Sequence, residues 1–174
     1  MDPLQVGFTA TKNLDATLKA CAKTSPDEKV GVVVKNNGKY DIVEYSELSD
    51  ADANKRDENG NLYLELGSIL IFMLSSKKLI ELSSDTKTLN KLYHKAYKKI
   101  EQWDAEAGKA VKPDVENGYK FELFLHNFLP FCADGKFGAL KVIRGEEFGP
   151  VKNKDGAATD TPTTARNLLM ESHT

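Results

Sequence analysis

Cysteine is scarce in this sequence, which excludes two classes of small stabilised domain. The 174 residues contain only Cys21 and Cys132, which are far apart and have no close-spaced cysteine or histidine to form a cluster. This pattern argues against a disulfide framework and against a structural zinc site, and it favours a reducing compartment.

Long hydrophobic runs are also absent. The longest one, Ile69–Leu74, is far shorter than the roughly 20 residues that a membrane-spanning helix needs. The N-terminal residues MDPLQVGFTATKN lack the apolar centre of a signal peptide. We therefore expect a soluble, cytoplasmic protein with no membrane partner.

No excess of one charge and no common catalytic motif is present. Lys and Arg total 24 against 26 Asp and Glu, so no basic field is available to hold nucleic acid. The sequence also lacks a glycine-rich phosphate loop, a nucleophile–base pair and an HExxH-type metal motif. These patterns alone do not name a reaction.

The length and the 40% share of hydrophobic residues predict a single domain over residues 1–174. We expect a short strand at Pro3–Phe8, then a helix capped by Asn13 that carries Leu14, Leu18 and Cys21. Further strands follow from residue 29 onward. This order of strand, helix and strand is typical of an α/β domain.

Residues 29–49, KVGVVVKNNGKYDIVEYSELS, predict a β-hairpin that ends on a carboxylate. Asn37 and Gly38 supply the turn, and alternation from Tyr40 puts Glu44 on the same face as Ile42. A carboxylate on a core-side face needs a polar partner or a ligand, so Glu44 is a candidate binding residue. The alternative is that Glu44 is simply solvated where the strand leaves the sheet.

Three further candidates lie at expected element boundaries. Gly67 and Ser68 are expected between a short strand and an apolar helix, where they would allow close approach of a ligand or form an ordinary turn. Lys120 is expected at the start of a helix over 119–131, and Lys152 lies next to the end of the segment RGEEFGPVKN. Either lysine could hold an anion or be solvated. A further helix is expected over 86–100, and Thr161 is expected to cap another.

Four strings of this sequence resemble the eukaryotic UDP-N-acetylglucosamine pyrophosphorylase family. They are KVGVVVKNNGKYDIVEYSELS, KPDVENGYKFELF, RGEEFGPVKN and TPTTAR, and they occur in the family's order over almost the whole chain. The resemblance implies part of a Rossmann-like nucleotidyltransferase (GT-A-type) mixed sheet flanked by helices. It also implies UTP and N-acetylglucosamine 1-phosphate as substrates, and UDP-N-acetylglucosamine and pyrophosphate as products.

The same resemblance implies that part of the catalytic domain is absent. Family members are more than twice this long and begin with an LxGGxGTRLG-type loop for the UTP phosphates, followed by a VDN segment whose acidic residue binds magnesium. Neither string is present. We therefore expect a fragment, whether an engineered piece, a proteolytic remnant or a truncated gene product. It should not turn over alone, and its magnesium ligand should lie in the missing N-terminal portion.

The resemblance also implies roles for individual residues. Glu44 and Tyr45 match the family's EY pair at the sugar, and Phe124 matches an aromatic residue beside it. Lys120 and Lys152 match two lysines that face phosphate oxygens, which makes them the candidate catalytic residues. Gly67 matches a family glycine, but Ser68 stands where the family has a sugar-contacting asparagine, which puts sugar selectivity in question. No residue is assigned as a metal ligand.

Two alternatives stay open. The chain could belong to a uridylyltransferase for another sugar 1-phosphate, such as glucose or N-acetylgalactosamine. It could also be a noncatalytic module that binds sugar nucleotides or another protein. The sequence indicates neither a protein partner nor an oligomeric state.

Overall fold

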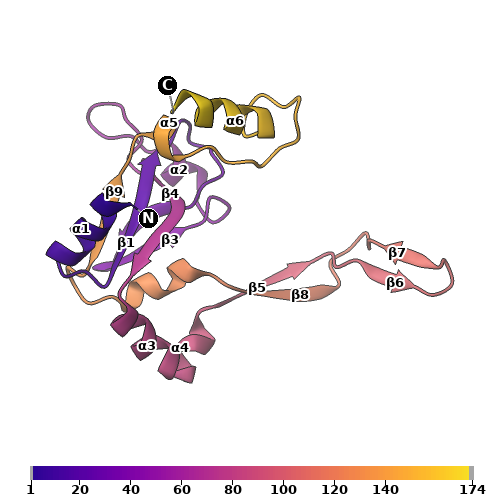
Figure 1. Cartoon of the computed structure of the whole chain (residues 1–174). Coiled ribbons are helices and arrows are strands. Elements are labelled where there is room, and N and C mark those ends of the chain that lie inside the picture. Colours follow the sequence, from indigo (N-terminus) through magenta and orange to yellow (C-terminus); the bar gives the residue numbers. More distant parts are fainter. Residues whose placement is uncertain (1, 173–174) are drawn as a thin grey trace. The chain divides into compact units, whose positions relative to one another are not determined.

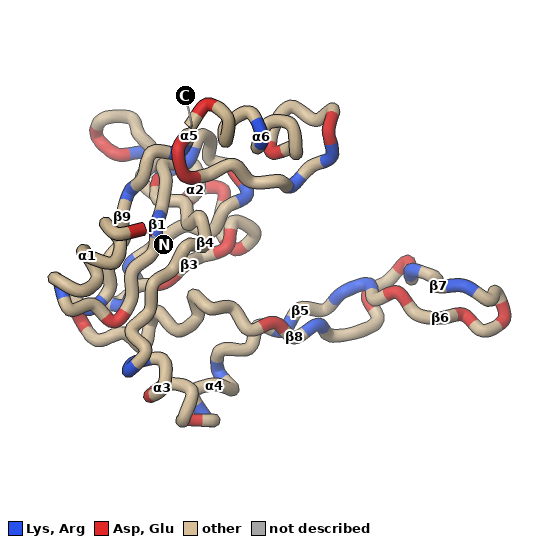
Figure 2. Tube along the Cα trace, viewed as in Figure 1, with Lys and Arg blue, Asp and Glu red and all other residues tan. Residues whose placement is uncertain are grey.

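The computed structural model describes residues 2–172, which fall into two compact units. Unit 1 comprises residues 2–78 and 129–172, and unit 2 comprises Leu79–Phe128. The prediction of one domain over the whole chain stays a prediction. Figure 2 shows that acidic and basic residues are interspersed along both units, without a long segment of one sign.

Unit 1 is built on a five-stranded mixed sheet with the strand order β3-β2-β4-β1-β9. Strand β1 lies between β4, which is antiparallel to it, and β9, which is parallel to it (Figure 1). The predicted mixed α/β architecture is confirmed. The strands are β1 (Ala16–Ala22), β2 (Val32–Asn36), β3 (Lys39–Val43), β4 (Leu66–Leu74) and β9 (Phe137–Lys141).

The helices of unit 1 are short. Helix α1 contacts β1 and β4, and its Phe8 packs so close to Gly138 of β9 that a side-chain carbon at Gly138 would lie 2.6 Å from the Phe8 ring. Helix α6 begins with a capping box at Thr161, as the sequence predicted, and packs beside α5 (Figure 1). The helices are α1 (Pro3–Thr11), α2 (Asp50–Asn54), α5 (Arg144–Glu147) and α6 (Pro162–Glu171). Helix α3 (Ser76–Ser84) begins in unit 1.

The N-terminal prediction is wrong in both of its elements. Asp2 caps a helix whose first residue is Pro3, where proline is favoured because it lacks an N–H that would have no partner. The predicted helix over Leu14, Leu18 and Cys21 is strand β1, in which Ala16 to Cys21 are all buried. A strand buried on both faces shows no alternation, so its sequence resembles that of a buried helix.

The hairpin of β2 and β3 is confirmed. Asn37 and Gly38 form its two-residue loop, with φ angles of 49° and 81°, as a type I′ turn requires. Val32 and Ile42 turn into the core, with exposed fractions of 0% and 4%.

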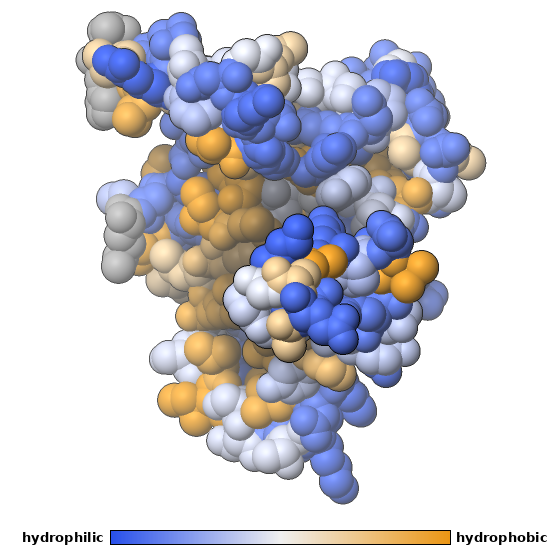
Figure 3. Space-filling model, turned by 90° about the vertical axis from the view of Figure 1, so that its right-hand side faces the viewer, coloured by the Kyte–Doolittle hydropathy of each residue, from blue (hydrophilic) through white to orange (hydrophobic). Residues whose placement is uncertain are grey.

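Unit 2 consists of a helical segment and two β-hairpins. Strands β5 and β8 pair antiparallel, and so do β6 and β7. In Figure 3 the end of this unit nearest the viewer is mostly hydrophilic, with small hydrophobic patches. Its elements are α4 (Thr86–Lys91), β5 (Tyr93–Lys98), β6 (Gln102–Asp104), β7 (Lys109–Val111) and β8 (Gly118–Leu123), and η1 (Leu125–Phe131) begins in it.

Two helices predicted in unit 2 are not formed as expected. The segment over 86–100 is a six-residue helix followed by β5, and the segment over 119–131 is mostly β8 followed by a 3-10 helix. Within residues 2–172 no helix is long and apolar enough to cross a bilayer.

Candidate functional site

Glu44 lies immediately after β3, where the chain turns away from the sheet. Its side chain is half-buried, and it passes beside Gly31, which precedes β2. A side-chain carbon at Gly31 would lie 2.6 Å from Ile42 Cγ2 and 3.3 Å from Glu44 Oε1. The lack of a side chain at Gly31 therefore makes room for the carboxylate and leaves bare backbone beside it.

Sequence reasoning missed Gly31. The signal is a single glycine inside a run of valines, because an isolated glycine in a strand often marks a close approach of another group. Tyr45, next to Glu44, begins the turn and is exposed.

Gly67 and Ser68 lie inside β4, and their predicted place at a strand-to-helix turn is wrong. Gly67 pairs with Val32 of β2 on one side and with Cys21 of β1 on the other. The N–H of Ser68 donates to the carbonyl of Gly31 at 2.8 Å. This bond places Ser68 next to the glycine that accommodates Glu44.

A bulge follows Ser68 in β4. Ser68 pairs with Ala20 and Ile71 pairs with Lys19, so Ile69 and Leu70 have no partner on β1. Leu70 has a φ angle of 61°, in the left-handed region that residues other than glycine rarely adopt. Its N–H donates to the Ser68 hydroxyl at 3.3 Å, so the serine side chain helps to hold the bulge.

Glu44, Gly67 and Ser68 therefore gather around Gly31. The cluster offers the half-buried Glu44 carboxylate as a strong hydrogen-bond acceptor, whereas Gly67 and the Ser68 hydroxyl are buried and a side-chain carbon at Gly67 would lie 2.9 Å from Val30 Cγ2. This set of groups is suited to a polyhydroxylated ligand, whose hydroxyls donate to the carboxylate.

Lys152 belongs to unit 1 as well and reaches the segment that leads to Gly31. Its Nζ donates to the carbonyl of Lys29 at 2.6 Å, and its backbone N–H donates to the carbonyl of Asp160 at 2.8 Å. A polar pocket of about 590 Å³ opens beside it, lined among others by Ser25, Asp27 and Arg144. Lys152 also lines this pocket, so an anion bound there would lie beside a lysine side chain.

Lys120 lies in the middle of β8, so its predicted place at a helix start is wrong and no helix dipole acts on it. Its Nζ pairs with Glu122 Oε1 at 2.8 Å, and the hydrogen bond from Lys120 lowers the pKa of the Glu122 carboxyl. Phe124 follows the strand and stacks between the rings of His94 and His126, with centroid distances of 5.1 and 5.2 Å.

The sequence-predicted residues thus divide between the two units. Glu44, Tyr45, Gly67, Ser68 and Lys152 belong to unit 1, and the structure brings Glu44, Gly67 and Ser68 together. Lys120 and Phe124 belong to unit 2. That these two residues approach Glu44 stays a prediction.

Residues 2–172 contain no group of three or more acidic, histidine or cysteine side chains that could hold a metal ion.

Comparison with known proteins identifies the family. The family model for UTP–glucose-1-phosphate uridylyltransferase matches residues 1–173. A UDP-N-acetylhexosamine pyrophosphorylase-like protein 1 from Xenopus tropicalis is 41% identical over 174 residues, which is 99% of this chain and 33% of that protein. The UDP-N-acetylglucosamine pyrophosphorylase of Saccharomyces cerevisiae is 35% identical over 172 residues, covering 98% of this chain and 35% of the yeast protein.

A solved structure agrees with these sequence matches. The uridine diphosphate N-acetylglucosamine pyrophosphorylase from Trypanosoma brucei superposes with a TM-score of 0.82 at 34% identity, covering 99% of this chain and 32% of that one. The chain thus spans about a third of the length of the relatives it matches. It belongs to the UTP–glucose-1-phosphate uridylyltransferase family, and its sequence resemblance to UDP-N-acetylglucosamine pyrophosphorylases is confirmed.

Proposed function

We propose that this chain forms the sugar 1-phosphate side of a UDP-N-acetylglucosamine pyrophosphorylase. The observation that carries the proposal is the cluster around Gly31, where the Glu44 carboxylate lies beside the glycine and the Ser68 N–H donates to the glycine carbonyl. Lys152 bonds to Lys29, two residues from that glycine. Glu44, which we propose binds the sugar, and Lys152, which we propose binds the phosphate, therefore belong to the same unit.

In this proposal Glu44 accepts hydrogen bonds from sugar hydroxyls. A hydrogen bond to a charged group contributes about 1.5–3 kcal/mol, so one carboxylate can account for much of the affinity for a small sugar. Tyr45 and Phe124 would contact the sugar ring, and Gly67 would allow its close approach.

Lys120 and Lys152 would act on the phosphates. An oxygen of N-acetylglucosamine 1-phosphate attacks the α-phosphorus of UTP, the bond to pyrophosphate breaks, and UDP-N-acetylglucosamine forms. The protein's contribution to such a transfer is mostly positioning and electrostatic stabilisation, which ammonium groups can supply. Magnesium would neutralise further phosphate charge, and we assign its ligands to no residue of this chain.

Binding of the sugar phosphate tests the proposal directly. Titration calorimetry of this chain with N-acetylglucosamine 1-phosphate should detect binding, and Glu44→Ala should abolish it. The proposal fails if the wild-type chain does not bind, or if Glu44→Ala binds equally well. Either result would favour a noncatalytic interaction module.

We further propose that this chain does not complete the reaction by itself. Mixed with UTP, magnesium and N-acetylglucosamine 1-phosphate, it should release no pyrophosphate above background. Robust release would contradict this part of the proposal. A cytoplasmic location also belongs to the proposal, and it is supported by Cys21 and Cys132, which are both free and buried.

Ser68 favours a second candidate, a uridylyltransferase for another sugar 1-phosphate. A serine hydroxyl is shorter than the asparagine amide that the family has there, and it offers fewer hydrogen bonds to an N-acetyl group. Titrations with glucose 1-phosphate and N-acetylgalactosamine 1-phosphate separate the two candidates. A UDP-N-acetylglucosamine pyrophosphorylase should bind N-acetylglucosamine 1-phosphate more tightly than either of them.

A further inference from the structure

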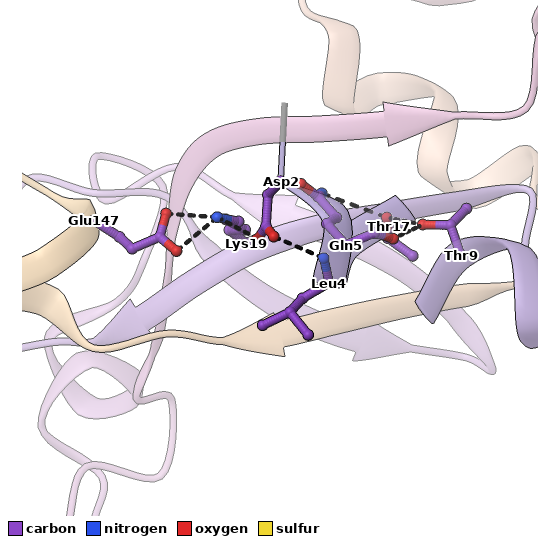
Figure 4. Close-up of polar contacts among 7 residues, drawn as sticks. All are labelled: Asp2, Leu4, Gln5, Thr9, Thr17, Lys19 and Glu147. Carbon is purple, nitrogen blue, oxygen red and sulfur yellow. Dashed lines mark hydrogen bonds and ion pairs between the residues drawn. The ribbon is translucent and has the colours of Figure 1, made fainter. Parts of the chain in front are cut away.

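Lys19 is a buried cation in the middle of strand β1. Its exposed fraction is 4%, and its Nζ lies 2.8 Å from Asp2 Oδ2 and 2.6 Å from both carboxylate oxygens of Glu147 (Figure 4). A buried ammonium requires such partners, because an unpaired charge away from water is strongly destabilising. The contact therefore connects Glu147, the last residue of α5, to the middle of strand β1.

The Asp2 end of this contact is itself fixed. Asp2 caps α1 by accepting the N–H of Leu4 at 2.8 Å, and α1 is attached to β1 through Gln5, Thr9 and Thr17, as Figure 4 shows. Asp2 and Lys19 are thus both held by neighbouring elements, α1 and β1. Glu147, the other partner of Lys19, comes from a distant part of the chain.

Arg144, the first residue of α5, also forms an ion pair. Arg144 Nη2 donates to Glu28 Oε1 at 2.6 Å, while its Nη1 reaches the carbonyl of Ala22 at 3.4 Å. The other oxygen of Glu28 accepts the N–H of Thr24 at 2.8 Å. Arg144 therefore connects α5 to the end of β1 and to the segment between β1 and β2.

These two ion pairs hold α5 at its two ends, and α6 packs beside it. A four-residue helix has almost no stability of its own, and α5 has no side-chain hydrogen bond at its N-cap. Its position therefore depends on contacts made by its residues, and ion pairs hold both of its ends.

The segment after α5 leads directly to Lys152. Phe148 lies under the Arg144 guanidinium, 5.1 Å from the ring centroid, and Lys152 Nζ lies 5.9 Å from the same ring. Lys152 then bonds to Lys29, the neighbour of the Glu28 that holds Arg144. Arg144 and Lys152 therefore both donate hydrogen bonds to residues 28–29.

We propose that the ion pairs Lys19–Glu147 and Arg144–Glu28 position Lys152 for the phosphate of a sugar 1-phosphate. This inference rests on the proposed function, since it assigns helpers to a residue that the proposed function places at the phosphate. Glu147, Arg144, Lys19 and Glu28 are positioning residues, because they act through the placement of α5 and not by contact with the ligand.

The test compares two ligands that differ in the group on the anomeric oxygen, which is a phosphoryl group in one and a methyl group in the other. NMR titration of the full 174-residue chain with N-acetylglucosamine 1-phosphate should give a dissociation constant at least tenfold higher for Glu147→Gln than for wild type. For the methyl glycoside of N-acetylglucosamine, which lacks phosphate, the dissociation constants of wild type and Glu147→Gln should agree within twofold. A general loss of structure would weaken both ligands alike.

A double-mutant cycle shows whether the ion pair acts through Lys152. Lys152→Met should weaken the sugar phosphate at least tenfold, and Glu147→Gln combined with Lys152→Met should be no weaker than Lys152→Met alone. Additive losses would overturn the inference. The inference would also be overturned if Lys152→Met weakens binding of the sugar phosphate but Glu147→Gln binds it as tightly as wild type. That result would leave the proposed function intact.

The remaining variants serve as controls. Glu65→Gln breaks the Lys141–Glu65 pair, which is 2.7 Å long and lies in the same unit, and it should change neither affinity. Arg144→Gln should repeat the effect of Glu147→Gln, and Arg144→Lys should restore part of the affinity because it keeps the charge. If Glu147→Gln does not fold, the same cycle is run with Arg144→Gln. Absence of sugar phosphate binding by wild type would refute the proposed function and this inference together.

Discussion

Gly31 matters as much as Glu44, although it carries no side chain. The carboxylate can lie where it does because the backbone opposite has no Cβ. Alternation along the strand predicts Glu44, and the isolated glycine among valines indicates a close approach at Gly31, but that the approaching group is Glu44 depends on how two strands pair. The lysines show the same limit, since Lys120 and Lys152 are polar residues whose surroundings only the fold decides.

Replacement of Gly31 by alanine should both destabilise the protein and disturb Glu44. The new carbon would lie 2.6 Å from Ile42 Cγ2, and overpacking of this kind costs about 1–3 kcal/mol in the free energy of unfolding. Urea denaturation of Gly31→Ala should show this loss.

Gly7→Ala provides the matched control for that measurement. A carbon added at Gly7, which is in helix α1, would have no heavy atom within 4 Å apart from its chain neighbours and the backbone of its own helix. Alanine there should stabilise by about 0.5–1 kcal/mol through helix propensity. Equal effects of the two substitutions would contradict the close approach at Gly31.

Removal of only the charge of Glu44 should weaken sugar binding by a measurable step. Glu44→Gln keeps the size of the side chain but replaces a charged acceptor with a neutral one, a loss of about 1–1.5 kcal/mol or roughly tenfold in affinity. Titration calorimetry with N-acetylglucosamine 1-phosphate measures it. Unchanged affinity together with unchanged stability would remove Glu44 from the site.

At the scale of elements, the hairpin turn and the cap at Thr161 were predicted correctly from the sequence, whereas the helix cap predicted at Asn13 was wrong. Asn37 and Gly38 form the hairpin turn and Thr161 caps α6, because such signals depend on a few adjacent residues. Hydrophobic periodicity was less reliable. Tyr119, Phe121 and Leu123 alternate as a strand, but Phe121, Phe124, Leu125 and Phe128 also fit a helix, and the pairing with β5 decides for the strand.

Strand β4 was misread for a related reason. Its residues LGSILIFML are almost uniformly apolar, so they fit a buried strand and a buried helix equally well. The bulge at Leu70 disturbs the alternation further. Contacts with β1 and β2, which the sequence does not reveal, fix this segment as a strand.

The Arg144–Glu28 ion pair at the start of α5 should make the free energy of unfolding depend on pH. Burial alone would raise the pKa of Glu28, but the N–H of Thr24 and the guanidinium of Arg144 outweigh it and hold the pKa below its usual value of 4.5. A lowered folded-state pKa gives stability that is present above pH 4.5 and is lost as the pH falls through the folded value. The Glu28 contribution should therefore disappear in acid.

Comparison with Arg144→Gln isolates this contribution from those of other carboxylates. Urea denaturation at a series of pH values should show that the wild-type advantage over Arg144→Gln is largest near neutral pH and shrinks below about pH 4.5. An advantage that stays constant down to pH 3 would contradict the ion pair as its source.

At the scale of the whole molecule, the two units should differ in local stability. Strand β1 is buried and paired on both sides, with β4 and with β9, whereas β6 and β7 form a two-stranded hairpin of three residues each. Isolated hairpins are marginally stable, and stability within a protein varies between such regions. Amides of β6 and β7 should therefore exchange with solvent far faster than those of β1.

Hydrogen exchange followed by mass spectrometry measures this difference on the intact chain. Peptides that cover residues 102–111 should be deuterated within the earliest time points, and peptides that cover residues 16–22 should be protected longest. Equal protection of both would mean that the hairpin has a partner on the protein that the strand pairing does not account for.

The burial of both native thiols gives the chain a practical property. Cys21 and Cys132 are 1% and 4% exposed, and burial raises the pKa of the Cys132 thiol to about 11, so neither thiolate is presented to reagents in the folded state. A single cysteine placed at the hairpin tip by Glu106→Cys would then be the one site to react with a maleimide dye. A fluorophore could be attached there without first removing the native cysteines.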